Sequence, residues 1–337
     1  MKKYIVFAFL IVFALPVLFT ACEEDFSSKE YYKYLVYLLS KENHNVYPAV
    51  FAFDGENEVT NYFSVACGGS LANPEEIRVN LELDSDTTLF RAYNTSNFDI
   101  DTSKFALILP ENRYRIGTMD VVFPANNSDQ YVKVPVTVNI NGLSPDSTYF
   151  IPLAIKSVSK FEVNPEKYNM LFRVVLENQY AEMLLGTYYT LKGNILNANE
   201  EALPGSEIAT TKLARPLNEN SIRVYAGAGP VKADFGEDPV VTKPTLEEIE
   251  KYGITLTVDE DNHVRITPFG TIEIDQKDAK DWNVYQEVRN NMVDDTVTKY
   301  FYLRYRYRTV KTPATDTTPA EYNNWVFVQE TLKRLEN

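Results

Sequence analysis

The chain has 337 residues, of which 47 are acidic and 33 basic, so its formal net charge is −14. The phosphate backbone repels such an acidic protein, which argues against nucleic acid as a partner. Aromatic residues make up 13% of the chain, which indicates a β-rich folded protein with a real core and not a disordered tether.

The N-terminal segment has the pattern of a secretory signal. Two lysines precede an apolar run over residues 5–19, too short for a membrane-spanning helix of about 20 residues. It fits the apolar region of a signal peptide, and the small residue Ala21 stands just before Cys22. We expect residues 1–21 to be a signal peptide that is cleaved between Ala21 and Cys22.

The sequence Phe-Thr-Ala-Cys over residues 19–22 resembles the bacterial lipobox, with Phe19 where that pattern prefers Leu, Val or Ile. The resemblance implies that Cys22 is lipidated and anchors the mature chain, now with a net charge of −16, to a membrane. Glu23, Glu24 and Asp25 resemble the surface-export signal of Bacteroidota lipoproteins and imply an outer-membrane location facing the cell exterior. The alternatives are a plain signal peptide and a solvated acidic leader.

The rest of the first half predicts an antiparallel β-sandwich. Apolar residues alternate with polar ones over residues 77–83 and 132–140, and turn signals separate the runs. Pro135 lacks an N–H group, so its strand is expected at a sheet edge or at a bulge. Cys67 has no partner once Cys22 is lipidated and is expected to be a small buried residue.

The string of motifs over about residues 30–178, including "VYLLSKENHNVYPAVFAF" and "DSTYFIPLAIKSV", resembles an N-terminal domain of Bacteroidota surface lipoproteins. That domain of unknown function is Ig-like and also precedes the barrel of some endo-β-N-acetylglucosaminidases. The resemblance carries over no catalytic residues. It implies an Ig-like β-sandwich over residues 34–178, and the acidic stretch before it, over residues 22–33, is expected to be a linker.

The second half begins after a domain boundary near residues 178–184. It contains one helix signal, in which Thr245 is the expected N-cap, Glu248 completes a capping box and Gly253 stops the helix. The "GTY" at residues 186–188, the aromatic run "YFYLRYRYR" and the final "ETLKR" resemble a lipocalin-like C-terminal domain of unknown function that often follows the first. The fold class is therefore all-β: an Ig-like sandwich, then a compact lipocalin-like barrel over residues 184–337.

Catalytic and metal signatures are weak. The two histidines are far apart and lack nearby ligands at metal spacing, and the acidic stretch at 259–262 is better explained as a hairpin turn than as a calcium site. No nucleophile elbow is present, and about 155 residues after the first domain are too few for a TIM barrel of about 250. We expect neither an enzyme nor a cofactor.

Carbohydrate recognition has better candidates, because a sugar's C–H face stacks on Trp or Tyr rings. Trp282 lies in a polar stretch with Tyr285 close by, whereas Trp325 shares a face with Phe327 and is expected in the barrel core. Arg304 and Arg306 alternate with inward residues of "YFYLRYRYR". They could clamp a glycan, although pairing with carboxylates on adjacent strands is the favoured interpretation.

The leading hypothesis is a lipid-anchored, non-catalytic glycan-binding or glycan-handling accessory protein of a polysaccharide-utilisation system. In the resembled family such proteins accompany outer-membrane glycan importers. The alternatives are an assembly component of a surface complex without a ligand of its own and, less favoured, a glycosidase.

Overall fold

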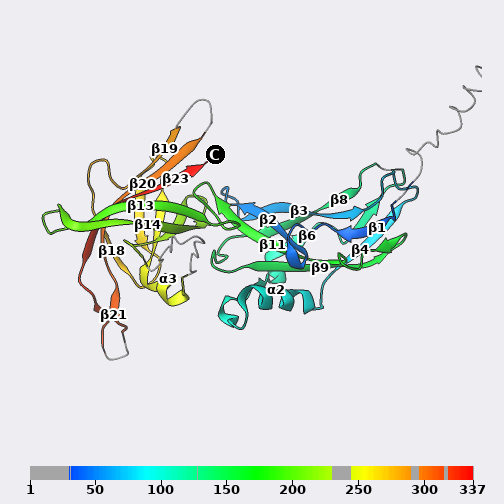
Figure 1. Ribbon diagram of the computed structural model, residues 1–337, viewed down its shortest axis with the longest axis horizontal. Helices are drawn as coiled ribbons and strands as arrows, with labels where there is room; N and C mark the ends of the chain where they lie inside the picture. The colour runs from blue at the N-terminus through cyan, green and yellow to red at the C-terminus, as the bar shows by residue number, and fades with distance from the viewer. Residues whose placement is uncertain are drawn as a thin grey trace, which may run out of the picture.

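The computed structural model describes Glu30 and residues 32–126, 128–229, 244–289, 296–314 and 318–336. Within these ranges the chain forms two β-rich bodies, one after the other along an elongated molecule (Figure 1). The expected all-β class, with a sandwich followed by a barrel, is confirmed. No helix in the described ranges is long and apolar enough to cross a membrane.

The first body has two sheets that enclose one apolar core. The five-stranded sheet has the order β10-β1-β3-β8-β6, and the other has the order β12-β11-β9-β4-β7, with β2 paired to β11 and β5 to β9. The strands are β1 (Leu35–Leu38), β2 (Val46–Ala52), β3 (Glu58–Cys67), β4 (Ile77–Leu83), β5 (Leu107–Ile108), β6 (Tyr114–Ile116), β7 (Asp120–Phe123), β8 (Tyr131–Asn139), β9 (Tyr149–Val158), β10 (Glu162–Val163), β11 (Asn169–Asn178) and β12 (Ala181–Glu182).

Period-two alternation places the expected side chains in this core. Val134, Val136 and Val138 of β8 are fully buried, and the free thiol of Cys67 is buried too, which raises its pKa to about 11. Leu83, the last residue of β4, is an exception at 36% exposed.

Helix α2 (Thr88–Phe98) was not expected from the sequence. It covers the outer side of the second sheet, where Tyr93 meets Phe150 with ring centroids 4.7 Å apart. Asp86 supports its start by accepting hydrogen bonds from the N–H and hydroxyl groups of Thr88. Short 3₁₀ turns complete this body at Asn43–Asn45, Thr102–Lys104 and Glu111–Arg113.

The second body is a nearly closed antiparallel barrel with the order β17-β16-β15-β14-β13-β23-β20-β18, and β19 also pairs with β20. The Gln276 side chain bridges the seam by hydrogen bonds to the backbone of Ile266 and Val264. The strands are β13 (Thr187–Leu196), β14 (Ala202–Asn218), β15 (Ser221–Tyr225), β16 (Gly253–Val258), β17 (Val264–Pro268), β18 (Glu273–Gln276), β19 (Val284–Arg289), β20 (Val297–Arg308) and β23 (Val326–Glu336), with a separate hairpin of β21 (Val310–Thr312) and β22 (Glu321–Tyr322).

The expected short helix is α3 (Leu246–Tyr252), and the capping box between Thr245 and Glu248 is confirmed. Gly253 ends the helix, but its backbone is extended, with φ −66° and ψ 132°, and not left-handed. A glycine is needed there because an added Cβ would lie 2.5 Å from the carbonyl oxygen of Ile249.

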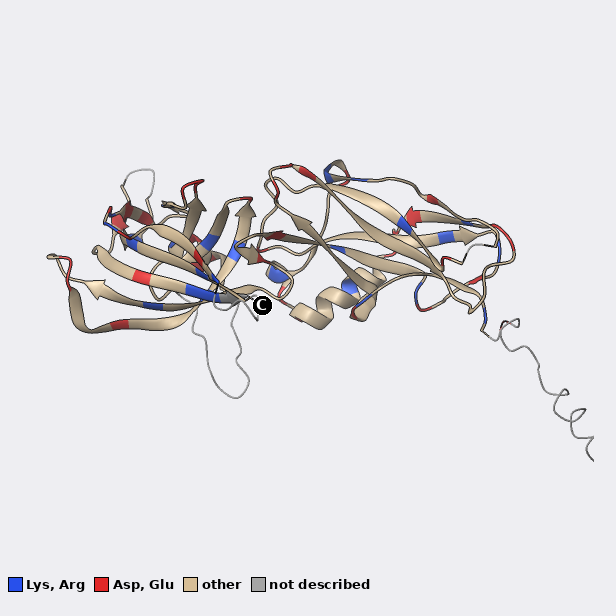
Figure 2. Ribbon diagram, turned by 90° about the horizontal axis from the view of Figure 1, so that it is seen from above, with Lys and Arg blue, Asp and Glu red and all other residues tan. Residues whose placement is uncertain are grey.

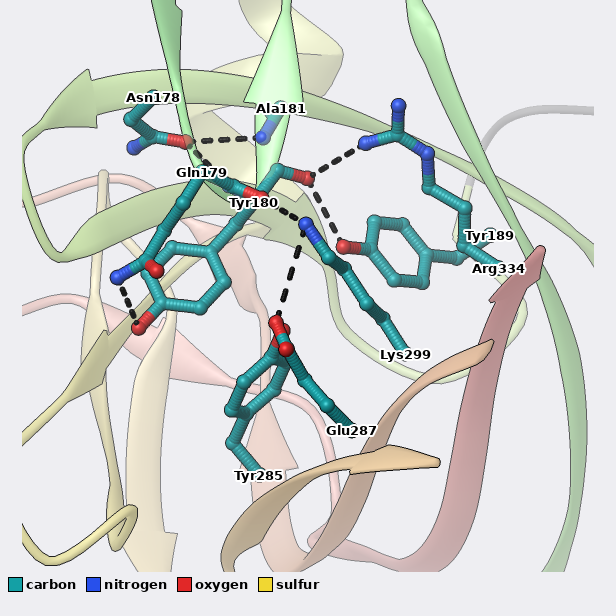
Figure 3. Close-up of polar contacts among 9 residues, drawn as sticks. All are labelled: Asn178, Gln179, Tyr180, Ala181, Tyr189, Tyr285, Glu287, Lys299 and Arg334. Atoms are coloured by element: carbon teal, nitrogen blue, oxygen red, sulfur yellow. Dashed lines mark hydrogen bonds and ion pairs between the residues drawn. The ribbon is translucent and has the colours of Figure 1, made fainter. Parts of the chain in front are cut away.

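The two bodies meet at a polar junction around Asn178–Ala181 (Figure 3). The Asn178 side chain accepts hydrogen bonds from the N–H groups of Tyr180 and Ala181 and donates to the carbonyls of Asn218 and Ser221. It therefore ties the end of β11 to the turn between β14 and β15.

Tyr180 closes one end of the barrel. Its ring is 4% exposed and meets the Tyr285 ring edge-on at 4.9 Å, while its carbonyl accepts a 2.8 Å hydrogen bond from the Tyr189 hydroxyl (Figure 3). Lys299 donates to the neighbouring carbonyl of Gln179. Tyr180, which follows β11 of the first body, is thus part of the core of the second body.

An ion pair also crosses the junction. The fully buried side chain of Arg223 in β15 donates to both carboxylate oxygens of Asp146 in the β8–β9 loop, one of them at 2.7 Å. A bidentate pair fixes both distance and orientation between the bodies.

We expect Asp146→Asn to lower the free energy of unfolding by about 2 kcal/mol, because it leaves the Arg223 charge buried without a counter-charge. Urea denaturation measures the change. Glu162→Gln is the control, because it breaks an ion pair with Lys33 in which both side chains are more than 60% exposed. Equal losses in the two variants would contradict the role of the junction pair.

Candidate functional site: the outer face of the barrel

The candidate site lies on the outer face of β20, the strand between β23 on one side and β18 and β19 on the other. Phe301, Leu303 and Tyr305 point inward and are fully buried. The alternate positions point outward and form a ladder of aromatic and basic side chains: Tyr300, Tyr302, Arg304, Arg306 and Arg308. Figure 2 shows basic and acidic segments interleaved along the barrel strands and not gathered in blocks of one sign.

Trp325 lies on this outer face, just before β23, and is 36% exposed. The expectation that it packs in the barrel core was wrong, because the register that pairs Arg306 with Phe327 and Tyr307 with Val326 turns Trp325 to the Arg308 side. The guanidinium carbons of Arg306 and Arg308 each lie 4.8 Å from its ring. Two cation–π contacts therefore hold the indole on the surface.

Carboxylates on the neighbouring strand hold these arginines in turn. Arg306 donates to Asp275 and Arg308 to Glu273, both at 2.6 Å. The hydrogen bond from Arg308 lowers the pKa of Glu273, and bonds from Lys277 and then Arg306 lower that of Asp275. The predicted pairing of arginines with carboxylates on an adjacent strand is confirmed.

Arg304 takes the middle of the ladder. Its guanidinium binds Glu200 of the β13–β14 hairpin at 2.7 Å and lies 5.4 Å from the Phe327 ring. The arginine is therefore held between a carboxylate and an aromatic ring, as Arg306 is.

A second aromatic group lies further along the same face. Trp282, in the loop before β19, meets the Tyr302 ring edge-on at 6.1 Å, and Tyr302 stacks on Tyr300 at 5.7 Å. Tyr285, expected beside Trp282 as a ligand contact, is instead only 5% exposed and packs on Phe301 in the barrel core. Tyr285 pairs with Phe301, an inward-pointing residue of β20, and therefore points inward as well.

The outer face thus combines aromatic rings with fixed hydrogen-bonding groups. Rigid indole and phenol rings can stack on the C–H face of a sugar, and the carboxylates and guanidinium groups beside them can bind hydroxyls. Tyr322 was not singled out from the sequence, although its ring lies 4.5 Å from the Arg308 guanidinium and extends the Trp325 group. The "EYNNW" spacing alone does not indicate that contact.

The remaining predicted residues, Ala21, Cys22, Glu23, Glu24 and Asp25, lie outside the described residues. The described end of the expected linker is tied to the first body: the Glu30 carboxylate accepts hydrogen bonds from the N–H groups of Ser70 and Leu71, which lowers its pKa to about 2.

The interior of the barrel contains a buried ionic cluster. Lys212 donates to Glu330 at 2.6 Å, and the Tyr305 hydroxyl donates to the same carboxylate oxygen at 2.8 Å. All three side chains are at most 2% exposed, so the cluster is closed to a substrate.

The acidic stretch at residues 259–262 is a turn in which the Asp259 side chain accepts from the N–H groups of Asp261 and His263, as predicted. Among the described residues, no group of three or more His, Cys, Asp or Glu is placed to hold a metal ion.

Comparison with known proteins gives the family. A family model for an N-terminal domain matches residues 29–162, and a companion model for a C-terminal domain matches residues 168–333. The chain belongs to this two-domain family. The predicted resemblance to its paired N- and C-terminal domains is confirmed.

Solved structures support the shared fold. A protein of unknown function from Bacteroides ovatus is 16% identical, with a TM-score of 0.62 over 89% of this chain and 94% of that one. An auxiliary nutrient binding protein from Bacteroides thetaiotaomicron is 13% identical, with a TM-score of 0.57 over 88% of this chain and 93% of that one. Both span nearly the whole two-domain chain.

A partial match involves EndoBT-3987 of Bacteroides thetaiotaomicron, solved with a Man5GlcNAc product. It is 17% identical over 41% of this chain and 30% of its own, with a TM-score of 0.29. No curated protein matches the chain.

The two family matches meet between residues 162 and 168, whereas β11 (Asn169–Asn178) pairs with β9 and β2 of the first body. Its side chains Phe172, Val174 and Leu176 belong to the first core. β11 therefore belongs structurally to the first body of this chain, although it lies at the start of the C-terminal family match.

We expect Lys212→Met and Glu330→Leu to lower the free energy of unfolding by about 3 kcal/mol each, because each leaves a buried charge without its counter-charge. The double variant should lose less than either single one, since it removes both charges. Denaturant titration of the four proteins measures the coupling, and strictly additive losses would contradict it.

Proposed function

We propose that this chain is a non-catalytic, lipid-anchored protein of the cell surface that binds glycans through the outer face of its barrel. The observation that carries the proposal is the exposed Trp325 ring, held in place by Arg306 and Arg308 and bordered by Asp275 and Glu273. A rigid ring beside fixed polar groups loses little conformational entropy when a sugar stacks on it.

The comparisons support the broader part of this proposal. A solved structure of nearly the same extent, 13% identical to this chain, is named an auxiliary nutrient binding protein, and glycans are one class of nutrient that such a protein could bind. Lipid attachment at Cys22 and export directed by Glu23, Glu24 and Asp25 would place the outer face where it meets extracellular polymers. An outer-membrane glycan importer on the same surface is the corresponding partner.

The glycan proposal predicts that Trp325→Ala weakens retention on polysaccharide affinity gels by about tenfold, because a stacked ring contributes roughly 1–1.5 kcal/mol. The protein would be residues 23–337, which include every described residue, and the gels would carry a panel of neutral polysaccharides. Trp282→Ala, in the second aromatic group, should weaken retention of long chains that reach both groups.

Tyr131→Ala is the matched control, since this tyrosine is 52% exposed but belongs to β8 of the first body. Equal retention of Trp325→Ala and the unmutated protein would rule out the outer face as the binding surface. Absence of retention across the panel would favour an assembly component without its own ligand. Release of reducing sugar, lost on replacing one carboxylate, would establish a glycosidase instead.

The anchoring proposal predicts that Cys22→Ser abolishes incorporation of labelled fatty acid and moves the protein from the membrane to the soluble fraction. A myristoyl-length chain by itself binds membranes only marginally, so stable attachment needs the full lipid group. Replacing Glu23, Glu24 and Asp25 by alanine should retain the lipid but remove accessibility to protease added to whole cells. Membrane attachment of the Cys22→Ser protein would contradict lipidation at this residue.

A further inference from the structure

A cleft at the junction of the two bodies carries a second inference, independent of the outer face. It consists of two adjacent hollows, of about 360 Å³ and 130 Å³, that share Asp146, Thr148 and Arg215. The larger hollow lies between the end of α2 with the loop that follows it and the start of α3, which sit on the same side of the molecule in Figure 1. Ligand sites commonly lie at such junctions between domains.

Arg215 of β14 is a cation without a partner in this cleft. Its side chain is partly buried, and among the described residues no hydrogen bond or ion pair engages its guanidinium, whose Nε is enclosed. The nearest carboxylate, Asp146, is occupied because Arg223 binds both of its oxygens. Burial lowers the pKa of Arg215 and Asp146 opposes the shift, but an arginine remains protonated at neutral pH.

A second arginine adds to the positive charge. Arg173 of β11 lines the smaller hollow together with Arg215, and the described residues give it no ion pair. The neighbouring acidic groups are already engaged: Glu182 accepts from the N–H groups of Leu184 and Leu185, and Asp101 pairs with Lys104 at 2.9 Å. Arg215 and Arg173 thus line the cleft with Asp146, whose carboxylate Arg223 already binds, in a chain whose net charge is −14.

The walls of the larger hollow indicate which kind of molecule would carry an anionic group into the cleft. Phe98 and Leu213 supply apolar surface, and Ser103 and Thr148 supply hydroxyl groups. A guanidinium binds a carboxylate through two parallel hydrogen bonds, and a hollow of this size holds a small molecule of one or two rings. We propose that the cleft binds a carboxylate-bearing saccharide, such as a uronic acid unit, whose carboxylate is clamped by Arg215.

The test is calorimetric titration of residues 23–337 with trigalacturonate and with its methyl ester, which removes the charge and keeps the sugar rings. We expect the acid to bind at least about tenfold more tightly than the ester, and Arg215→Gln to remove this preference. Arg215→Lys keeps the charge but loses the planar fork, so its affinity should be intermediate.

Arg265→Gln is the matched control, because it removes the same charge from an exposed position in β17 outside the cleft; its affinity should match that of the unmutated protein. If Arg215→Gln does not fold, Arg173→Gln should weaken binding of the acid by at least about threefold.

Three results would overturn the proposal: no binding of trigalacturonate at millimolar concentration, equal binding of acid and ester, or unchanged binding in Arg215→Gln. Equal binding of a triglutamate peptide would overturn the assignment to saccharides. Retention on neutral polysaccharide gels is measured in parallel. Loss of retention on these gels would contradict the proposal for the outer face, whereas absence of trigalacturonate binding would contradict the proposal for the cleft.

Discussion

The arrangement of this protein depends on the junction that Tyr180 and the Arg223–Asp146 pair form between two separate cores. Tyr180 extends from the end of the first body into the barrel, and the ion pair fixes the angle between the bodies at a second point. A buried ring and a bidentate ion pair restrain translation and rotation together. The cleft around Arg215 exists because these two contacts hold its walls in place.

In the barrel, inward-pointing and outward-pointing side chains differ in chemical type. Inward positions of β14, β20 and β23 place aromatic rings and the ionic pair of Lys212 and Glu330 in the barrel interior. Outward positions carry the aromatic and arginine ladder. The recognition surfaces proposed for this domain are therefore its outer face and the junction.

Several local features could be predicted because they depend on near neighbours in the sequence. The alternation in β8, the capping box at Thr245 and the arginine–carboxylate pairs beside β20 follow from spacing and charge. Helix α2 was missed because its burial depends on Phe150, which is distant in sequence. Trp325 and Tyr285 were placed on the wrong sides because their directions depend on cross-strand register with β20.

The sequence by itself determined the β-rich class through composition and periodicity, and the two-domain order through its resemblance to a known family; it also predicts the lipid anchor from an N-terminal signal. Only the tertiary structure decided which aromatic rings reach the surface and which charges lack a partner. Arg215 is the clearest case. Nothing next to it in the sequence shows that Asp146, almost 70 positions earlier, is engaged by Arg223, because the competition for one carboxylate arises only when two domains meet.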